Sequence, residues 1–204
     1  MFFRRPDHPL DSYWHRTLGP TLGAVVLFLV EVIQIVLISA AIIIPVRTFL
    51  IQPFYVQGAS MEPNFYDHEY LIINEISYQF SEPVRGDIVV FRYPRDPSQF
   101  FIKRVIGLPG EVVEVDNGRV RIFNEAYPDG VVLDEEYLDL TVTPGQERVT
   151  LGTNEYFVMG DNRDESLDSR SFGPIARDAI VGKVWIRGLP LTRIKIFETP
   201  DYQI

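Results

Sequence analysis

Residues 24–46 are almost wholly apolar, and this stretch constrains the fold of the chain more than any other feature. A helix of that length can span the hydrocarbon core of a bilayer, which is about 30 Å thick. Three arginines precede the stretch, whereas only Arg47 follows closely. Positive charges favour the cytoplasmic side of a membrane. We therefore expect residues 1–23 in the cytoplasm, a single-pass anchor in the plasma membrane, and the rest of the chain on its outer face.

A cleaved signal peptide is the alternative to an anchor, because residues 39–41 (Ser-Ala-Ala) are small enough for a cleavage site. The chain stays apolar beyond them, and the whole run is longer than the apolar region of a usual signal peptide. We therefore favour an uncleaved anchor. Glu31 and Gln34 interrupt it and lie one helical turn apart. Glu31 can lie near the inner interface, be protonated or meet a partner helix, and we favour the first.

The composition of the remaining chain excludes several classes of function. The 204 residues allow one membrane segment and one domain with a core of its own. A formal net charge of −9 argues against a nucleic-acid partner. The absence of cysteine excludes disulfides and thiolate metal sites, and only three histidines are present. We expect no metal and no cofactor.

After Pro53 the chain alternates short β-rich runs with turn signals, which predicts a mostly β domain. Residues 116–118 (Asp-Asn-Gly) separate two of these runs and indicate a tight hairpin. No long helical period follows the anchor. The predicted strands are residues 71–73, 87–91, 100–106, 112–115, 119–123 and 181–186.

Residues 58–63 (Gly-Ala-Ser-Met-Glu-Pro) form a small-residue turn that presents Ser60 shortly after the apolar stretch. A serine hydroxyl needs a base to become a nucleophile. Two of the three histidines precede the apolar stretch, which leaves His68 in a charged turn. The hydrolase pattern Gly-x-Ser-x-Gly fails, because Glu62 stands at the second glycine.

Lysine can serve as the base when burial lowers its pKa. Lys103 lies in a predicted strand, and alternation places Phe101 and Val105 on the same face. An amine between these side chains is desolvated. Ser60 and Lys103 are therefore the best nucleophile and base that the chain offers. The residues alone leave open a turn serine and a strand lysine whose amine reaches water.

The chain resembles the type I signal peptidases from about the end of the apolar stretch to Ile186. Four blocks in the family's order carry the resemblance: residues 60–63 (Ser-Met-Glu-Pro), 85–91 (Arg-Gly-Asp-Ile-Val-Val-Phe), 103–110 (Lys-Arg-Val-Ile-Gly-Leu-Pro-Gly) and 160–170 (Gly-Asp-Asn-Arg-Asp-Glu-Ser-Leu-Asp-Ser-Arg). The approach at residues 47–49 and 52–54 also fits. Each block alone is moderately specific, and the four in order are highly specific.

The resemblance implies a signal-peptidase-like catalytic β-core made of residues 52–110 and 155–190. A smaller inserted subdomain, residues 111–154, separates the two parts, and residues 191–204 form a C-terminal tail. The insert is acidic and rich in turns, so we expect a solvated edge hairpin and loops there.

The resemblance also implies a membrane-bound serine endopeptidase that removes signal peptides from preproteins after an Ala-x-Ala-like site. Ser60 attacks the scissile carbonyl, and a neutral Lys103 takes its proton. Membrane lipid is the expected second partner. Two alternatives are a self-cleaving repressor with the same fold and an anchored, non-catalytic β-domain that binds exported proteins.

Several residues are expected to support this pair. By the resemblance, Ser166 hydrogen-bonds the Lys103 amine and Gly160 makes room near it. Two ion pairs hold the strands that carry the pair. Their members are Asp168 with Arg170, and Arg104 with Asp161.

An oxyanion hole needs donors that point at the developing negative charge. The backbone N–H of Ser60 is the expected donor. Some relatives place a serine hydroxyl two residues earlier, where this chain has Gly58. A backbone group or a water is left as the second donor.

Substrate binding is expected by strand addition, in which alternate side chains of an extended peptide enter pockets. Bulky apolar walls leave shallow pockets, which fits small residues at the first and third positions before the cut. Phe65 taken singly is better explained as core. Three apolar residues near the rim, Phe49, Leu50 and Ile51, are expected to touch lipid. By the resemblance, the positions that line the pockets are Phe54, Val56, Met61, Phe65, Phe101 and Ile102.

Overall fold

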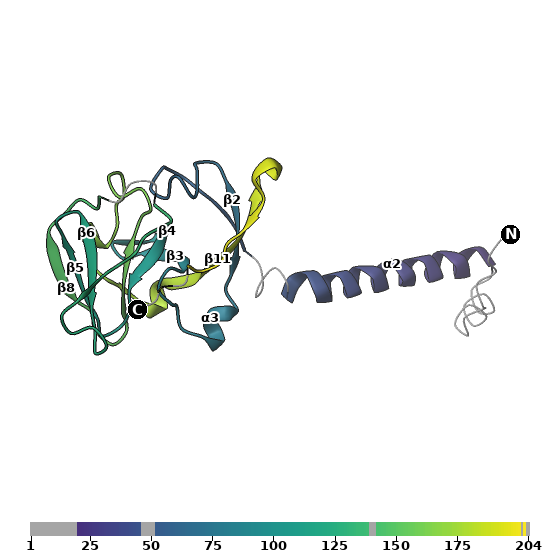
Figure 1. Ribbon diagram of the computed structural model, residues 1–204. Helices are drawn as coiled ribbons and strands as arrows, with labels where there is room; N and C mark the ends of the chain where they lie inside the picture. Colours follow the sequence, from purple (N-terminus) through teal and green to yellow (C-terminus); the bar gives the residue numbers. More distant parts are fainter. Residues whose placement is uncertain (1–19, 46–51, 139–141, 201, 203–204) are drawn as a thin grey trace. The chain divides into compact units, whose positions relative to one another are not determined.

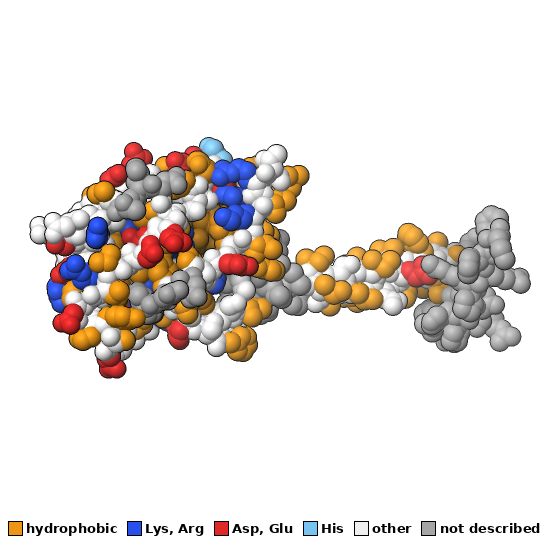
Figure 2. Space-filling model, in the orientation of Figure 1, with side chains coloured by type: hydrophobic (Ala, Val, Ile, Leu, Met, Phe, Trp, Pro, Cys, Tyr) orange, Lys and Arg blue, Asp and Glu red, His pale blue; other side chains and the backbone are white. Residues whose placement is uncertain are grey.

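The computed structural model describes residues 20–45, 52–138, 142–200 and 202, and it divides into two compact units, residues 1–48 and 49–204. The first unit contains helix α2 (Pro20–Pro45), which includes a segment, Thr21–Ile44, that is long and apolar enough to cross a membrane. Hydrophobic side chains cover the visible face of this helix in Figure 2. The helix begins earlier than the predicted residue 24. The predicted lipid contacts at residues 49–51 lie outside the described residues.

The second unit is built on an antiparallel sheet with the order β1-β2-β11-β3-β4-β9-β10, and β12 pairs with β11 (Figure 1). Short helical segments connect its strands: α3 (Ser77–Phe80), α4 (Ser169–Phe172), η2 (Arg177–Ala179) and η3 (Leu191–Arg193). The strands are β1 (Gln52–Tyr55), β2 (Tyr70–Asn74), β3 (Ile88–Tyr93), β4 (Asp96–Gly107), β9 (Glu155–Met159), β10 (Ile175–Ala176), β11 (Ile180–Leu189) and β12 (Lys195–Ile196).

A second antiparallel sheet has the order β7-β6-β5-β8 and lies within residues 111–154. Its strands are β5 (Val112–Asp116), β6 (Arg119–Phe123), β7 (Val131–Val132) and β8 (Glu147–Thr150). The predicted hairpin joins β5 to β6, and Asn117 and Gly118 both have positive φ, at 50° and 78°. Asparagine and glycine tolerate this left-handed conformation. The structure confirms the hairpin and the mostly β fold.

The cores follow from alternation along the strands. On β4, Phe101 and Val105 pack with β3 and β9 on one face, and Ile102 packs against a cluster from β1, β2 and β11 on the other. A third cluster joins the two sheets, because Ile106 and Phe157 from the first sheet pack with apolar side chains of the second. The two sheets therefore share buried apolar surface, which stabilises their arrangement.

The segment predicted as a C-terminal tail contributes to the fold. Its strand β12 pairs with β11, and the ring of Phe197 stacks on that of Phe65 with centroids 4.3 Å apart. Thr199 Oγ1 donates to Asp87 Oδ1 at 2.6 Å. Tyr202 packs against the cluster between the sheets.

Candidate active site

The turn that carries Ser60 is tied down at both ends. The N–H of Gly58, a residue with φ of 90°, donates to Asp67 Oδ1 at 3.0 Å, and the N–H of Phe65 donates to the Met61 carbonyl at 2.8 Å. A glycine adopts this φ without steric cost. The Ser60 carbonyl accepts from the N–H of Asn162 at 3.1 Å. These bonds join the turn to the loop that follows β9.

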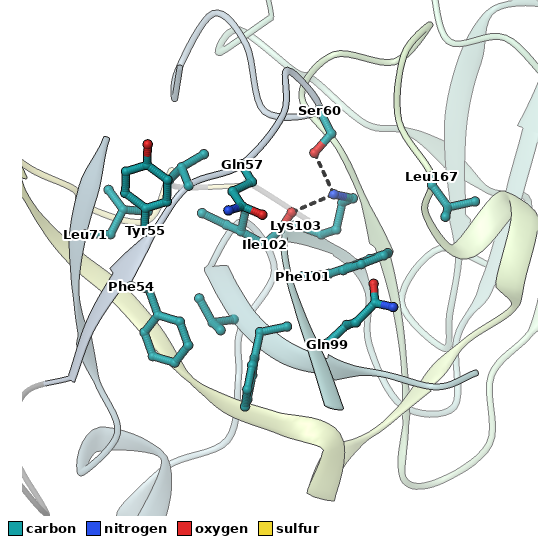
Figure 3. Close-up of a pocket in the computed structure, with 13 residues that line it drawn as sticks. Phe54, Tyr55, Gln57, Ser60, Leu71, Gln99, Phe101, Ile102, Lys103 and Leu167 are labelled. Atoms are coloured by element: carbon teal, nitrogen blue, oxygen red, sulfur yellow. Dashed lines mark hydrogen bonds between the residues drawn. The ribbon is translucent and has the colours of Figure 1, made fainter. Parts of the chain in front are cut away.

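Lys103 projects from β4 toward this turn, and the two side chains point at one another in Figure 3. Its amine lies 2.7 Å from Ser60 Oγ and donates to the Ile102 carbonyl at 2.8 Å. The residue is only 3% exposed. Burial lowers the pKa of Lys103 to about 8, although the charges of Asp168 and Asp161 oppose the shift. A substantial fraction of the amine is therefore neutral near physiological pH.

The other candidate bases have different partners. Lys183 lies 2.6 Å from Asp87 Oδ1 and donates to Thr199 Oγ1. His68 has an exposed side chain that hydrogen-bonds the Tyr55 hydroxyl and lies 3.3 Å from Asp67. Of these three candidate side chains, Lys103 is the one that the fold brings to Ser60.

The two predicted ion pairs are both formed beside Lys103. Arg104 binds Asp161 through two bonds, 2.8 Å from Nε and 2.7 Å from Nη2, and both side chains are buried. Arg170 binds Asp168 in the same way at 2.9 and 2.8 Å. Burial alone raises the pKa of Asp168, but Arg170 and the N–H of Gly160 lower it below the ordinary value. The Asp168 carboxylate therefore remains charged, as a bidentate arginine contact favours.

Two of the predicted supporting contacts differ in the structure. The Ser166 hydroxyl is buried and forms no hydrogen bond to Lys103; it lies near Asp168 and helps to lower the pKa of that carboxyl. The absence of a side chain at Gly160 makes room for Ser166 and for the backbone of Ser60 rather than for Lys103. A Cβ on it would lie 2.2 Å from Ser166 Oγ and 2.4 Å from the Ser60 carbonyl oxygen. The prediction for Ser166 was wrong: the Lys103 amine bonds Ser60 Oγ and the Ile102 carbonyl instead.

The backbone of Gly58 is already engaged. Its amide donates to Asp67, so it is not directed at a substrate oxyanion. The assignment of Gly58 to the oxyanion hole is therefore not supported in this conformation. The N–H of Ser60 stays the predicted donor.

A cavity of about 360 Å³ opens beside Ser60 and Lys103. Phe54, Val56, Phe101 and Ile102 line it as predicted. In Figure 3, Phe54 lies on one side of the Lys103 side chain and Leu167 on the other. Sequence reasoning missed the remaining lining residues, for which no periodic signal exists: Tyr55, Gln57, Leu71, Val90, Gln99, Phe100 and Leu167.

Met61 and Phe65 are corrected from pocket to core. They are 1% and 0% exposed and pack in the cluster with Leu71 and Val184. For Phe65 the sequence already favours a place in the core, which the structure confirms.

The insert does more than form a solvated edge. Glu135 forms a buried ion pair with Arg163, which lies in the loop between Gly160 and Arg170. Arg163 also donates to Thr143 Oγ1 at 2.7 Å and to the Gly160 carbonyl at 3.0 Å. The acidic composition of the insert therefore gave no indication that one of its carboxylates, Glu135, pairs with a residue outside the insert. The one feature of the sequence that pointed to this contact was the presence of Arg163 within the block at residues 160–170.

No group of three or more histidine, aspartate or glutamate side chains within the described ranges is arranged to hold a metal ion.

Comparison with known proteins identifies the family of the chain. The family model for signal peptidase, peptidase S26, matches residues 29–188. The chain is 37% identical over 184 residues to signal peptidase I of Leptolyngbya laminosa, covering 85% of this chain and 87% of that protein. It is 37% identical over 165 residues to a probable signal peptidase I-2 of Synechocystis, covering 78% and 72%.

A third relative and a solved structure give the same family. Signal peptidase IB of Staphylococcus aureus MRSA252 is 32% identical over 191 residues, covering 85% of this chain and 96% of that protein. The crystal structure of a signal peptidase I from Enterococcus faecalis V583 is 34% identical, covers 50% of this chain and 97% of that chain, and superposes with a TM-score of 0.43. The assignment rests on the sequence matches. The chain belongs to the signal peptidase family, peptidase S26, whose members are serine peptidases.

Proposed function

We propose that this protein is a membrane-bound serine endopeptidase that removes N-terminal signal peptides, with Ser60 as the nucleophile and Lys103 as the general base. The observation that carries the proposal is the 2.7 Å distance between Ser60 Oγ and Lys103 Nζ beside an open cavity. A nucleophile and a base at this distance can exchange a proton directly. The family assignment supports the same activity.

The reaction proceeds in two stages. Ser60 Oγ attacks the scissile carbonyl carbon, and its proton passes to the neutral Lys103 amine. The resulting ammonium then protonates the leaving amine as the peptide bond breaks, which leaves an acyl-enzyme on Ser60. A water attacks this ester, Lys103 takes a proton from the water, and the Ser60 hydroxyl is restored as the signal peptide leaves.

The electrostatics of Lys103 suit this cycle. Burial makes the neutral form of the amine far more accessible than in an exposed lysine, and its pKa of about 8 lies close to neutral pH, where a general base works well. Asp161 and Asp168 moderate the shift and stabilise the ammonium that forms during turnover. Their arginine partners, Arg104 and Arg170, keep both carboxylates in place.

The cavity supports recognition of small side chains. Strand β1 pairs with β2 through one edge, so its other edge can pair with an extended peptide. Phe54 and Val56 on this side and Phe101 and Ile102 on β4 form apolar walls. Such walls favour an Ala-x-Ala site, with the alternate alanines directed into the cavity. Phe54 and Phe100 pack edge to face and narrow it further.

The proposed location is the plasma membrane, with α2 as the anchor, the N-terminus in the cytoplasm and the catalytic unit on the outer face. The arginines before α2 support this orientation. Export substrates present their cleavage sites at that surface.

Proteolysis by the detergent-solubilised full chain tests the proposal. The protein is incubated with a secretory preprotein that carries an Ala-x-Ala site, and the products are identified by mass. We expect one cut after the second alanine, lost in both Ser60→Ala and Lys103→Ala. A cut that survives Lys103→Ala would move the base elsewhere, with His68 next to test. A folded protein that binds the preprotein without cutting it would favour the anchored binding domain instead.

A further inference from the structure

Asn64 lies four residues after the nucleophile, and its side chain joins three parts of the molecule. Its Nδ2 donates to Asp161 Oδ2 at 2.9 Å and to the Tyr137 carbonyl at 3.0 Å. Asp161 follows β9, and Tyr137 belongs to the insert. The amide therefore ties the turn that carries Ser60 to two segments that are distant in the chain.

The carboxylate that accepts from Asn64 is itself rigidly held. Asp161 is bound at both oxygens by Arg104, whose side chain is 3% exposed, while that of Asp161 is 0% exposed. Arg104 also donates to the Gly86 carbonyl at 3.0 Å. Because Arg104 is the residue after Lys103 on β4, the chain of contacts from Asn64 ends on the strand that carries the base. Buried pairs with this geometry resist displacement.

The insert covers this ion pair through Tyr137. The Arg104 guanidinium lies 3.9 Å from the centre of the Tyr137 ring. The Tyr137 hydroxyl donates to Glu135 Oε1 at 2.6 Å, and Glu135 pairs with Arg163. The carbonyl that receives the Asn64 amide is thus part of a fixed segment. Because both acceptors of the Asn64 amide are held in place, the hydrogen bonds to them can fix the position of Asn64.

We propose that Asn64 is a positioning residue, which holds the Ser60 turn against the Arg104–Asp161 pair and thereby sets the distance from Ser60 Oγ to Lys103 Nζ. The inference rests on the proposed function of Ser60 and Lys103. Ser60 lies on the turn after β1 and Lys103 on β4, so the distance between them depends on tertiary contacts that join these two elements. A misplacement of about 1 Å between reacting groups can cost a hundredfold in rate.

The backbone at Asn64 has separate support. Its carbonyl accepts from Arg187 Nη1 at 3.0 Å, and Arg187 forms a buried pair with Glu69. The N–H of the next residue, Phe65, donates to Met61. Replacing the amide side chain therefore leaves these backbone contacts in place, so the variant is expected to fold with a displaced turn.

The test compares Asn64→Leu, which has a similar volume but no donor, with Asn64→Ser, which is too short to reach both acceptors. The matched control is Asn124→Leu. The Asn124 amide also donates to a buried carboxylate, Glu111 Oε1 at 3.0 Å, and Glu111 is paired with Arg85. Asn124 lies in the insert and does not bond the Ser60 turn. Each full-length protein is assayed for preprotein cleavage on its alkaline plateau, and its thermal unfolding is recorded.

We expect both Asn64 variants to lose about ten- to a hundredfold in kcat with an unchanged KM, because the cavity walls are untouched. The control is expected to lose stability without losing kcat. Native kcat in a folded Asn64 variant would overturn the positioning role, as would an equal loss of kcat in Asn124→Leu. Should Asn64→Leu fail to fold, Asn64→Ser decides alone, since it introduces no bulk. Failure of the unaltered protein to cleave would instead count against the proposed function.

Discussion

Lys103 Nζ lies 2.7 Å from Ser60 Oγ, although 43 positions separate the two residues in the chain. The serine sits on a turn after β1 and the lysine on β4, and these strands are not neighbours in the sheet. The N–H of Asn162, in the loop after β9, donates to the Ser60 carbonyl and joins the turn to that loop. The catalysis that we propose therefore depends on contacts that no local sequence pattern encodes.

The activity should follow the protonation of Lys103. Ser60 can give its proton only to the neutral amine, so kcat falls as pH drops through the lysine pKa of about 8 and reaches a plateau above it. The pH dependence of cleavage, measured from about pH 6 to pH 10, checks this. A midpoint near about 10.4, the value of a free lysine, would contradict a desolvated base.

The same burial makes stability depend on pH. The folded protein holds Lys103 with a pKa of about 8 against an ordinary 10.5, so between these values the unfolded chain binds more protons. Stability relative to Lys103→Met should rise by about 3 kcal/mol across that window. Urea unfolding at several pH values measures it. Lys195→Met, which removes an exposed lysine, controls for the loss of one charge, and equal pH dependence in the two variants would refute the idea.

Gly160→Ala should abolish cleavage. The added Cβ would lie 2.4 Å from the Ser60 carbonyl oxygen and 2.2 Å from Ser166 Oγ, so the nucleophile turn must shift. We expect a loss of about a hundredfold or more in kcat. Gly188→Ala on β11 is the control, because its Cβ would meet nothing closer than 3.9 Å. Wild-type rates for Gly160→Ala would show that the turn can relax without cost.

The ion pair between the insert and the core should contribute strongly to stability. Glu135→Ala leaves the Arg163 guanidinium buried without its carboxylate. We expect this to lower the free energy of unfolding, measured with urea, by about 3–5 kcal/mol. Glu114→Ala removes a carboxylate that pairs with two partly exposed arginines, Arg121 and Arg148. That change should cost less than about 1 kcal/mol. Similar losses for the two variants would argue that Glu135 is no more than a surface contact.

The apolar walls of the cavity should exclude large side chains. Replacing the alanine before the cut with phenylalanine is expected to stop cleavage, because we expect the apolar walls formed by Phe54, Val56 and Ile102 to leave only a shallow subsite at that position. The middle residue of Ala-x-Ala points away from the cavity by strand alternation, so phenylalanine there should be tolerated. Both preprotein variants are assayed beside the unchanged one. Cleavage of the first at the normal rate would disprove this account of the pocket.

Local patterns in the sequence were enough to predict the apolar helix, the main strands and the hairpin at Asn117 and Gly118. These features depend on periodicity and on backbone preference within a few residues. Ser60 and Lys103 were selected because the chain contains few alternative bases, and the family blocks supplied the ion pairs. Their roles in catalysis stay predictions until the variants are assayed.

Tertiary structure decided the rest, because the environment of a side chain depends on segments that are distant in the chain. Burial sets the Lys103 pKa, and packing turns Met61 and Phe65 into the core. The Lys103 amine bonds the Ile102 carbonyl, and Ser166 is left without the bond expected of it. The contacts of Asn64 and Glu135 cross between the core and the insert, so only the folded chain brings them to the site.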